Sequence, residues 1–342
     1  DLPRAVNLAL KQNLGLVRAR LNVDAAARVV AGEKAEFGFR LVPAGTATRS
    51  TGADAAEVGL GLFKRTGIGT RAGVSGALAR DEVPGSDPLE RGILRVTVTQ
   101  PLLQRFGKQV NQDPLVTARL GLRSTRRLLE QQKADIVLEV AATYEDVLRL
   151  EGQVRAEEDF FERLDQVYRL TRARERQGRA RHVDTLRLEL QRGESQARLL
   201  RAGEDLAARR EDLADLLGFS PEKQFTLEPP PLLEVDLAGP RENLRIARSH
   251  RMDYAQVLED YADASRGIAL ARRTLLPDLS LVARYELFDW RSSPLQDPDD
   301  ELYSVGLAAN TDLIAARDRQ RVEDEVINRG ALRQQVLSVE SA

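Results

Sequence analysis

The sequence predicts a mainly α-helical chain with several β-strands, built from two related halves. The segment that begins at Ala9 and the segment that begins at Ala247 align at a constant offset of about 238 positions. Each half continues from a short helix and an Ala-rich helix into residues that alternate between apolar and polar. A repeat this long is no solenoid unit and indicates a duplicated half-protein. The matched pairs include Leu8 and Ile246, Leu14 and Met252, Ala26 and Ala264, Ala31 and Ala269, and Leu41 and Leu279.

The composition excludes several classes of function. The 342 residues include 51 Lys and Arg against 53 Asp and Glu, so the chain has no net basic field to attract nucleic acid. The absence of Cys excludes a thiolate nucleophile, a Cys-ligated metal and a disulfide framework. No run of 18 apolar residues occurs, so we expect no membrane-spanning helix, although short barrel strands escape such a test. No signal-peptide pattern follows Asp1, and we expect that one has been removed.

The first half begins with helices and then changes character. Residues 1–38 are predicted to form a helical segment that is broken near Asn13–Gly15. Residues 39–100 are richer in Gly, Thr and Val and alternate between apolar and polar, which predicts strands. The stretch 39–80 has more alternating pieces than one strand needs, so we expect a bulge or an extracellular hairpin there. Pro101 ends this region, because proline cannot donate to a sheet ladder.

Residues 101–217 are predicted to form a long helical hairpin. Its two helices are expected at about Pro114–Leu150 and Gln153–Leu217, with the reversal of the chain between them. The second helix carries apolar residues every seven positions, which predicts supercoiled packing against other helices. Gly218 then stops the helix.

The second half repeats the order of the first. We expect a connector at 218–240, a helical segment at 241–275, strands at 276–312 and the start of a last long helix at 313–342. In the clearest strand, Leu279–Leu287, every odd position is apolar and most even positions are polar. The segment Tyr303–Thr311 alternates in the same way and is its expected partner.

These strands have the length of membrane-spanning strands, since nine to eleven tilted residues cross a bilayer. The pattern also fits an ordinary antiparallel sheet with one wet face. The recurrence of helix, strands and helix in both halves favours the membrane interpretation. It predicts a lumen-facing set and a lipid-facing set, which are Ser280, Arg284 and Glu286, and Leu279, Leu281 and Tyr285, respectively.

In this order and spacing the chain resembles the TolC family of outer-membrane efflux proteins over essentially its whole length. The residues that carry the resemblance are the Ala-rich openings of both halves, Leu276-Pro277-Asp278-Leu279, Val98-Thr99-Gln100-Pro101-Leu102-Leu103 with Phe106-Gly107, Tyr144-Glu145-Asp146-Val147-Leu148, Gly178 with Asp184 and Leu186, and Leu213 to Gly218.

The resemblance implies a homotrimer. Each protomer would give four strands to one twelve-stranded β-barrel in the outer membrane, and its long helices would build a coiled-coil α-helical barrel in the periplasm. Such a protein is a passive exit duct that works with a periplasmic adaptor and an inner-membrane transporter in tripartite efflux or type I secretion. The resemblance implies contact with outer-membrane lipid and no catalytic residues. We expect no cofactor and no metal, and the charge balance gives no reason to expect nucleic acid.

Three positions depart from the family pattern. Phe39 and Asp312 stand where a proline is usual. Ala342 lies only about 30 residues into the last long helix, so we expect the returning helix of the second hairpin to lie outside this sequence.

The reversal of the long hairpin is the segment for which the family resemblance implies contact with an adaptor. We expect it at Leu148, Arg149, Leu150, Glu151 and Gly152, which combine apolar and charged side chains. The alternative is that these residues only cap the turn, with Gly152 permitting the reversal.

Other motifs are better explained structurally. Gly67–Gly73 resembles a phosphate-binding loop but lacks the strand-to-helix context, so strand and turn glycines are favoured. His182 near Asp184 has no accompanying nucleophile, and His250 is isolated, so neither predicts a catalytic or metal site. The acidic stretch Asp297–Glu301 is expected to be a solvated loop.

Two other functions compete with the duct. A soluble coiled-coil interaction protein would need no detergent, but it leaves the duplicated strands unexplained. A periplasmic adaptor also carries a long helical hairpin, but it would have β segments flanking a single hairpin. An enzyme is the weakest interpretation, because no acid, base and nucleophile converge.

Overall fold

The computed structural model describes residues 1–50, 54–82, 88–220, 225–230, 239–290, 299–310 and 315–341. Its contacts divide the chain into two compact units, each made from two separate segments of the sequence. The first unit comprises Asp1–Val23 and Arg126–Glu242, and the second comprises Asp24–Thr125 and Asn243–Ala342.

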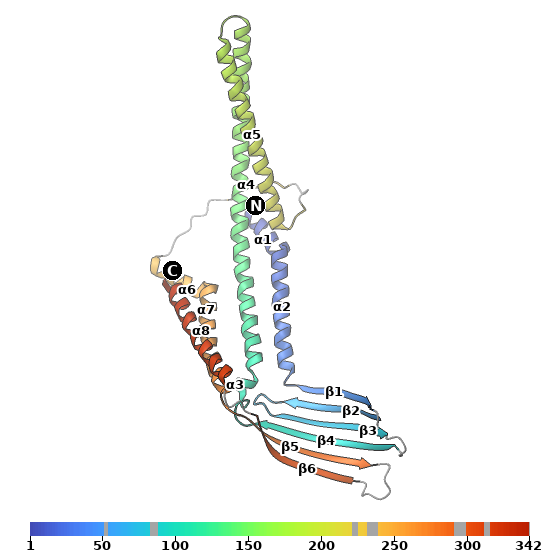
Figure 1. Cartoon of the computed structure of the whole chain (residues 1–342). Coiled ribbons are helices and arrows are strands. Elements are labelled where there is room, and N and C mark those ends of the chain that lie inside the picture. The colour runs from blue at the N-terminus through green and yellow to red at the C-terminus, as the bar shows by residue number, and fades with distance from the viewer. Residues whose placement is uncertain are drawn as a thin grey trace. The chain divides into compact units, whose positions relative to one another are not determined.

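Helices and strands follow one another in the order drawn in Figure 1. The first half contains α1 (Leu2–Gln12), α2 (Leu14–Ala35), β1 (Phe39–Arg49), β2 (Asp54–Arg65), β3 (Arg71–Glu82), β4 (Leu89–Pro101), α3 (Lys108–Asn111), α4 (Asp113–Arg176) and α5 (His182–Leu217). The second half contains α6 (Pro240–His250), α7 (Met252–Thr274), β5 (Asp278–Trp290), β6 (Asp299–Asn310) and α8 (Ala316–Ser341).

The duplication predicted from the sequence is visible in the element boundaries. The first residues of α1 and α6, Leu2 and Pro240, are 238 positions apart, and so are Leu14 and Met252 at the starts of α2 and α7. In each half the Ala-rich helix leads directly into a strand. The predicted internal duplication is therefore confirmed.

The first unit has a small core where α1 and the start of α2 pack against the middle of α4 and the end of α5. Val140, Tyr144 and Val147 of α4 are fully buried with Leu16 and Leu213. The Tyr144 hydroxyl donates to the carbonyl oxygen of residue 228 at 2.7 Å and accepts from its amide at 3.0 Å, which satisfies a buried polar group.

The long hairpin differs from the prediction. α4 runs without interruption for 64 residues, about 96 Å of helix, and passes through Gly152. The chain reverses at residues 177–181, where Gly178 has a φ of 72° that suits glycine. The predicted reversal at 148–152 is wrong, because a glycine inside a helix costs only about 1 kcal/mol and the flanking residues continue the helix.

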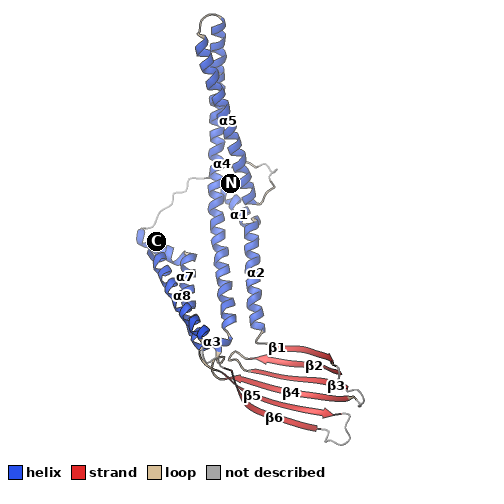
Figure 2. Cartoon of the chain, in the orientation of Figure 1, coloured by secondary structure: helices blue, strands red, loops and turns tan. Residues whose placement is uncertain are grey.

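The second unit contains a single antiparallel sheet of six strands in the order β1-β2-β3-β4-β5-β6, drawn red in Figure 2. Four strands were predicted, so that number is wrong. The excess alternation in 39–80 belongs to a further hairpin of the same sheet, β2 and β3, whose turn is closed by hydrogen bonds between residues 66 and 70. The described residues of the second half supply β5 and β6, which are its two predicted strands.

Some predicted features lie outside the described residues. These are Thr311 and Asp312 after β6, Pro231 of the connector, and Asp297 and Pro298 of the acidic stretch. The remaining acidic residues, 299–301, belong to β6 and not to a loop. Helices α7 and α8 lie side by side in the second unit (Figure 1).

Candidate functional site

The pairing of the six strands sorts their side chains onto two faces, because successive residues point to opposite sides of a sheet. One face is apolar across all six strands. Its larger apolar side chains are Phe39, Leu41, Pro43, Val58, Leu60, Leu62, Val74, Leu78, Leu94, Val96, Val98, Leu279, Leu281, Tyr285, Leu287, Tyr303, Val305 and Leu307.

This apolar face is open in the chain. Tyr303, Val305 and Leu307 of β6 are 82%, 71% and 67% exposed. Soluble monomers rarely expose a contiguous apolar patch of this extent, so such a face indicates an interaction with protein or membrane. The strands are also long, with 11 residues in β1 and 13 in β4, which is enough to cross a bilayer when tilted.

The described charged side chains of the apolar face lie only near its two ends. At the end next to the helices, the Lys64 ammonium lies 4.3 Å from the centre of the Phe39 ring. At the other end Arg80 lies 3.8 Å from Glu90, and Glu301 stands opposite Leu287. A band without charge therefore separates two charged borders, as the outer surface of a membrane barrel requires.

The opposite face is polar and carries ion pairs between strands. Glu286 is buried and contacts the guanidinium of Arg95 on β4, and Arg284 lies 3.9 Å from the same carboxylate. Asp81 of β3 and Arg91 of β4 are 3.3 Å apart. Two arginines compete for one carboxylate, so this face keeps exposed positive charge.

The predicted strand sets are found on opposite faces. Ser280, Arg284 and Glu286 lie on the polar face, and the set Leu279, Leu281 and Tyr285 lies on the apolar face. Sequence reasoning missed Arg91 and Arg95, although the alternation of β4 could have identified them. Whether the two faces meet lumen and lipid stays a prediction at this point.

Glycines allow an aromatic ring to lie flat on the polar face. A Cβ added at Gly61 or at Gly73 would come within 2.4 Å of ring carbons of Phe63. No side chain fits there, so the glycines are required by the close approach of the ring. The Gly67–Gly73 motif is therefore a turn followed by β3, and the preference for strand and turn glycines is confirmed.

Asn111 fixes the end of the sheet next to α3. Its side-chain amide donates to the carbonyl oxygens of Arg105 at 2.7 Å and Gly107 at 3.0 Å. Its oxygen accepts from Nη2 of Arg65 at 3.0 Å. This buried residue ties the β2–β3 hairpin to the start of the helical region, and no sequence signal singled it out.

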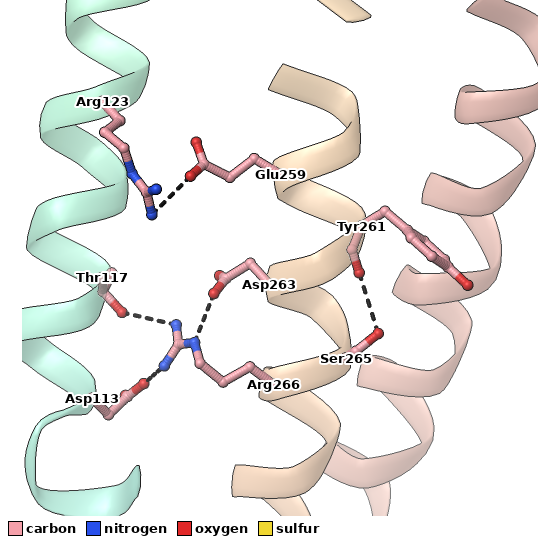
Figure 3. A network of polar contacts seen from close by, with 8 residues as sticks. All are labelled: Asp113, Thr117, Arg123, Glu259, Tyr261, Asp263, Ser265 and Arg266. Atoms are coloured by element: carbon pink, nitrogen blue, oxygen red, sulfur yellow. Dashed lines mark hydrogen bonds and ion pairs between the residues drawn. The ribbon is translucent and has the colours of Figure 1, made fainter. Parts of the chain in front are cut away.

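A second polar cluster joins α4 to α7 (Figure 3). Arg266 contacts Asp113, donates to Thr117 at 3.2 Å and lies 2.7 Å from Asp263. One turn further along, Arg123 and Glu259 are 2.8 Å apart. These contacts hold the start of α4 against α7.

The charges of this cluster perturb one another. Burial lowers the pKa of Arg266. Despite its contact with Arg266, Asp263 has a raised pKa, because it is partly buried and lies near Asp260, Glu259 and Glu325. An adjacent cavity of about 780 Å³ is lined by α4, α7, α8 and the segment between β4 and α4. The arrangement has no nucleophile placed beside a base, so it supports packing and not chemistry.

Arginine side chains of α5 contact acidic and aromatic side chains of α4. We call these contacts arginine clamps, because they hold the two helices of the long hairpin together. Arg192 lies 3.3 Å from Asp165 and 4.9 Å from the centre of the Tyr168 ring. Arg198 repeats this arrangement with Glu157 at 3.5 Å and the Phe160 ring at 5.5 Å. In both cases one arginine of α5 contacts an acidic residue of α4 and also the aromatic residue three positions after it. This repeated contact fixes the register of the two helices.

The segment predicted as the hairpin tip lies within this clamped region. Glu151 is 2.5 Å from Arg210 of α5, Arg149 is 3.0 Å from Asp146, and Leu150 is buried. Leu148 packs against the core of the first unit, and Gly152 is helical. These residues connect the helices of the hairpin along its length and do not form its end.

At the actual reversal His182 Nδ1 lies 2.7 Å from Glu175 Oε1. The Thr185 hydroxyl and the His182 ring lower the pKa of Glu175. His182 thus joins the two ends of the turn, and neither this residue nor Asp184 is part of a catalytic group in the described structure.

In the part of the chain that the structure describes, no helix combines the length and the apolarity needed to cross a membrane. No group of three or more His, Cys, Asp and Glu side chains in the described ranges has the geometry to hold a metal ion.

The fold is that of TolC-family outer-membrane channels. VceC from Vibrio cholerae matches 99% of this chain over 75% of its own, at a TM-score of 0.69 and 16% identity. The outer-membrane channel OprN gives 0.69 and 18%, with 99% of this chain and 72% of its own covered. CmeC from Campylobacter jejuni gives 0.71 and 14%, with 99% and 67% covered. No family model matches the sequence, and no curated protein matches it significantly.

Proposed function

We propose that the chain is one protomer of a passive outer-membrane duct that serves a tripartite efflux pump or a type I secretion system. The observation that carries this proposal is the six-stranded sheet, with an uncharged apolar band on one face and ion pairs on the other. The similarity to outer-membrane channels supports it.

The open edges of the sheet argue for an oligomer. Among the described residues β1 pairs only with β2, and β6 pairs only with β5, so two strands of the sheet keep one unpaired side each. Unpaired backbone groups are not tolerated in hydrocarbon, so the edges must meet. Pairing β6 of one chain with β1 of the next would close a barrel.

Three copies are favoured because the family resemblance implies a trimer. With six strands per chain, such a trimer would form a barrel of about eighteen strands and not the twelve first expected. Barrels of 16–18 strands leave an aqueous channel. The mechanism is therefore conduction through a wide pore, without bond chemistry.

The two faces then take their expected roles. Leu279, Leu281 and Tyr285 would contact outer-membrane lipid, because charge on that surface is costly. Ser280, Arg284 and Glu286 would line the water-filled lumen.

The long hairpin would extend into the periplasm and contact the adaptor through its tip at residues 177–181. An inner-membrane transporter would complete the pathway. The arginine clamps between α4 and α5 would keep the projecting hairpin straight and in register over its length.

The test is the assembly state of the chain after extraction from outer-membrane fractions in detergent. Light scattering should give three times the 38.0 kDa chain mass, and the trimer should conduct ions in planar bilayers. A water-soluble monomer that needs no detergent would contradict the proposal and favour the soluble coiled-coil alternative.

A further inference from the structure

Two arginines face each other on the polar face at the end of the β2–β3 hairpin. Arg65 is the last residue of β2, Arg71 is the first residue of β3, and the two are direct partners in the sheet. Their Cβ atoms are therefore about 5 Å apart. Like charges opposite each other destabilise a sheet, so this pair needs an explanation.

The described residues do not neutralise this pair. Arg65 donates from Nη2 to Asn111, which is uncharged, and its guanidinium carbon lies 5.9 Å from the centre of the Phe37 ring. Its Nε is buried without a hydrogen-bond partner. The exposed side chain of Arg71 makes no hydrogen bond or ion pair with any described residue. The nearby carboxylate of Asp278 is held by Nε of Arg105 at 3.1 Å. Two guanidinium charges therefore remain available, and one of their donors is already desolvated.

Both arginines line one cavity of about 330 Å³. Its other polar lining groups are the side chains of Thr99, Ser280, Asn111 and the Arg105–Asp278 pair. The cavity has the size of a small solute and lies where the polar face ends against α3. One cavity thus holds a buried donor without a partner and an arginine side chain without an acidic partner, and these are groups to which an oxyanion binds.

We propose that this cavity binds a small oxyanion, a carboxylate or a phosphate, between Arg65 and Arg71. The planar guanidinium groups each offer two parallel donors to such a group, and Thr99 and Ser280 supply hydroxyl donors. If the proposed duct is correct, the site lies in the lumen wall and gives the pore a preference for anionic cargo. The binding itself depends only on the sheet.

The test is thermal denaturation and isothermal titration of the full chain in an uncharged detergent, with inorganic phosphate and with acetate as probes. Phosphate should bind and raise the melting temperature. The Arg71→Gln variant should weaken phosphate binding by about tenfold or more. Without phosphate the same variant should melt no lower than the parent chain, since it relieves a like-charge contact and removes no described partner.

The matched control is Arg91→Gln, which removes an arginine of the same face that already has an acidic partner. It should leave phosphate binding within about twofold of the parent chain. Equal phosphate binding by the parent and Arg71→Gln would overturn the proposal, and so would the absence of binding by the parent. A response only to vesicles that contain phosphatidylglycerol, with none to free phosphate, would also overturn it and assign the arginines to lipid headgroups. Binding in detergent is measured whether or not the chain conducts, so this outcome is separate from the test of the duct.

Discussion

A charge placed in the middle of the apolar face should prevent membrane assembly, whereas the same charge on the next residue should not. Val305 and Ser304 are neighbours on β6 and point to opposite faces. Val305 stands opposite Ala283, and its side chain is part of the uncharged band. The variants Val305→Arg and Ser304→Arg therefore differ in the face that receives the charge and in little else.

The magnitudes separate the two variants. An arginine on the lipid face near the bilayer centre costs about 2–4 kcal/mol. Three copies would multiply this to about 6–12 kcal/mol per trimer. Ser304 stands opposite Arg284, so its variant places like charges together at a cost of about 0.2–1 kcal/mol. The second cost is several times smaller and is screened by water in the lumen.

The assay is folding of each purified variant into preformed liposomes, followed by urea titration and by gel mobility without heating. Ser304→Arg should fold and form the oligomer like the parent chain, and Val305→Arg should fail or unfold at much lower urea. Equal assembly of both variants would refute the assignment of the apolar face to lipid. Failure of Ser304→Arg alone would reverse the assignment of the two faces.

Three further predictions concern the long hairpin. Gly152→Ala should raise the free energy of unfolding by about 0.5–1 kcal/mol in urea titrations, because Gly152 is helical, whereas Gly178→Ala should lower it by about 1 kcal/mol because of its positive φ. Arg192→Ala should cost about 1 kcal/mol through loss of its acidic and aromatic partners on α4, compared with no change for Arg201→Ala on the same helix. Glu175 has a folded pKa below its ordinary 4.5, so the tip should be stable above that pH and lose protection from hydrogen exchange as the pH falls through the lowered value.

Each of these has a clear contrary result. Stabilisation by Gly178→Ala would show that Gly178 has no positive φ, and that the chain reverses at another position. Equal effects of Arg192→Ala and Arg201→Ala would show that the clamp contributes nothing to the hairpin. A Glu175→Gln variant that keeps the same pH profile of hydrogen exchange at the tip would assign the pH dependence to another group.

The sequence was most informative where the signal is local. Alternation along β5 was enough to divide Ser280 and Glu286 from Leu279 and Leu281, because side-chain direction in a strand depends only on residue parity. The duplication was equally visible, since matched small residues recur at a constant offset. Neither inference requires knowledge of what contacts what.

The sequence did not give the position of the hairpin reversal or the number of strands. Gly152 and Gly178 look alike in sequence, but Gly152 lies within a continuous helix whose neighbours contact α5, such as Glu151 with Arg210, whereas Gly178 lies at the turn. In β2 and β3 the alternation is present, but alternation alone does not show whether the extra pieces form a bulge or a further pair of strands in the same sheet. The facing arginines of this hairpin were missed because their proximity depends on strand register.

The extra hairpin also explains how a duplicated fold can widen without losing its topology. In the second half β5 follows α7, and β6 runs back to α8. In the first half β1 follows α2, and β4 runs back toward α4. β2 and β3 form one antiparallel pair between β1 and β4, so β4 still runs antiparallel to β1. The number of inserted strands is even, and the register keeps Phe39 and Val98 on the same face. The helices therefore leave the sheet from the same end, while each protomer gains two strands of circumference for the proposed barrel.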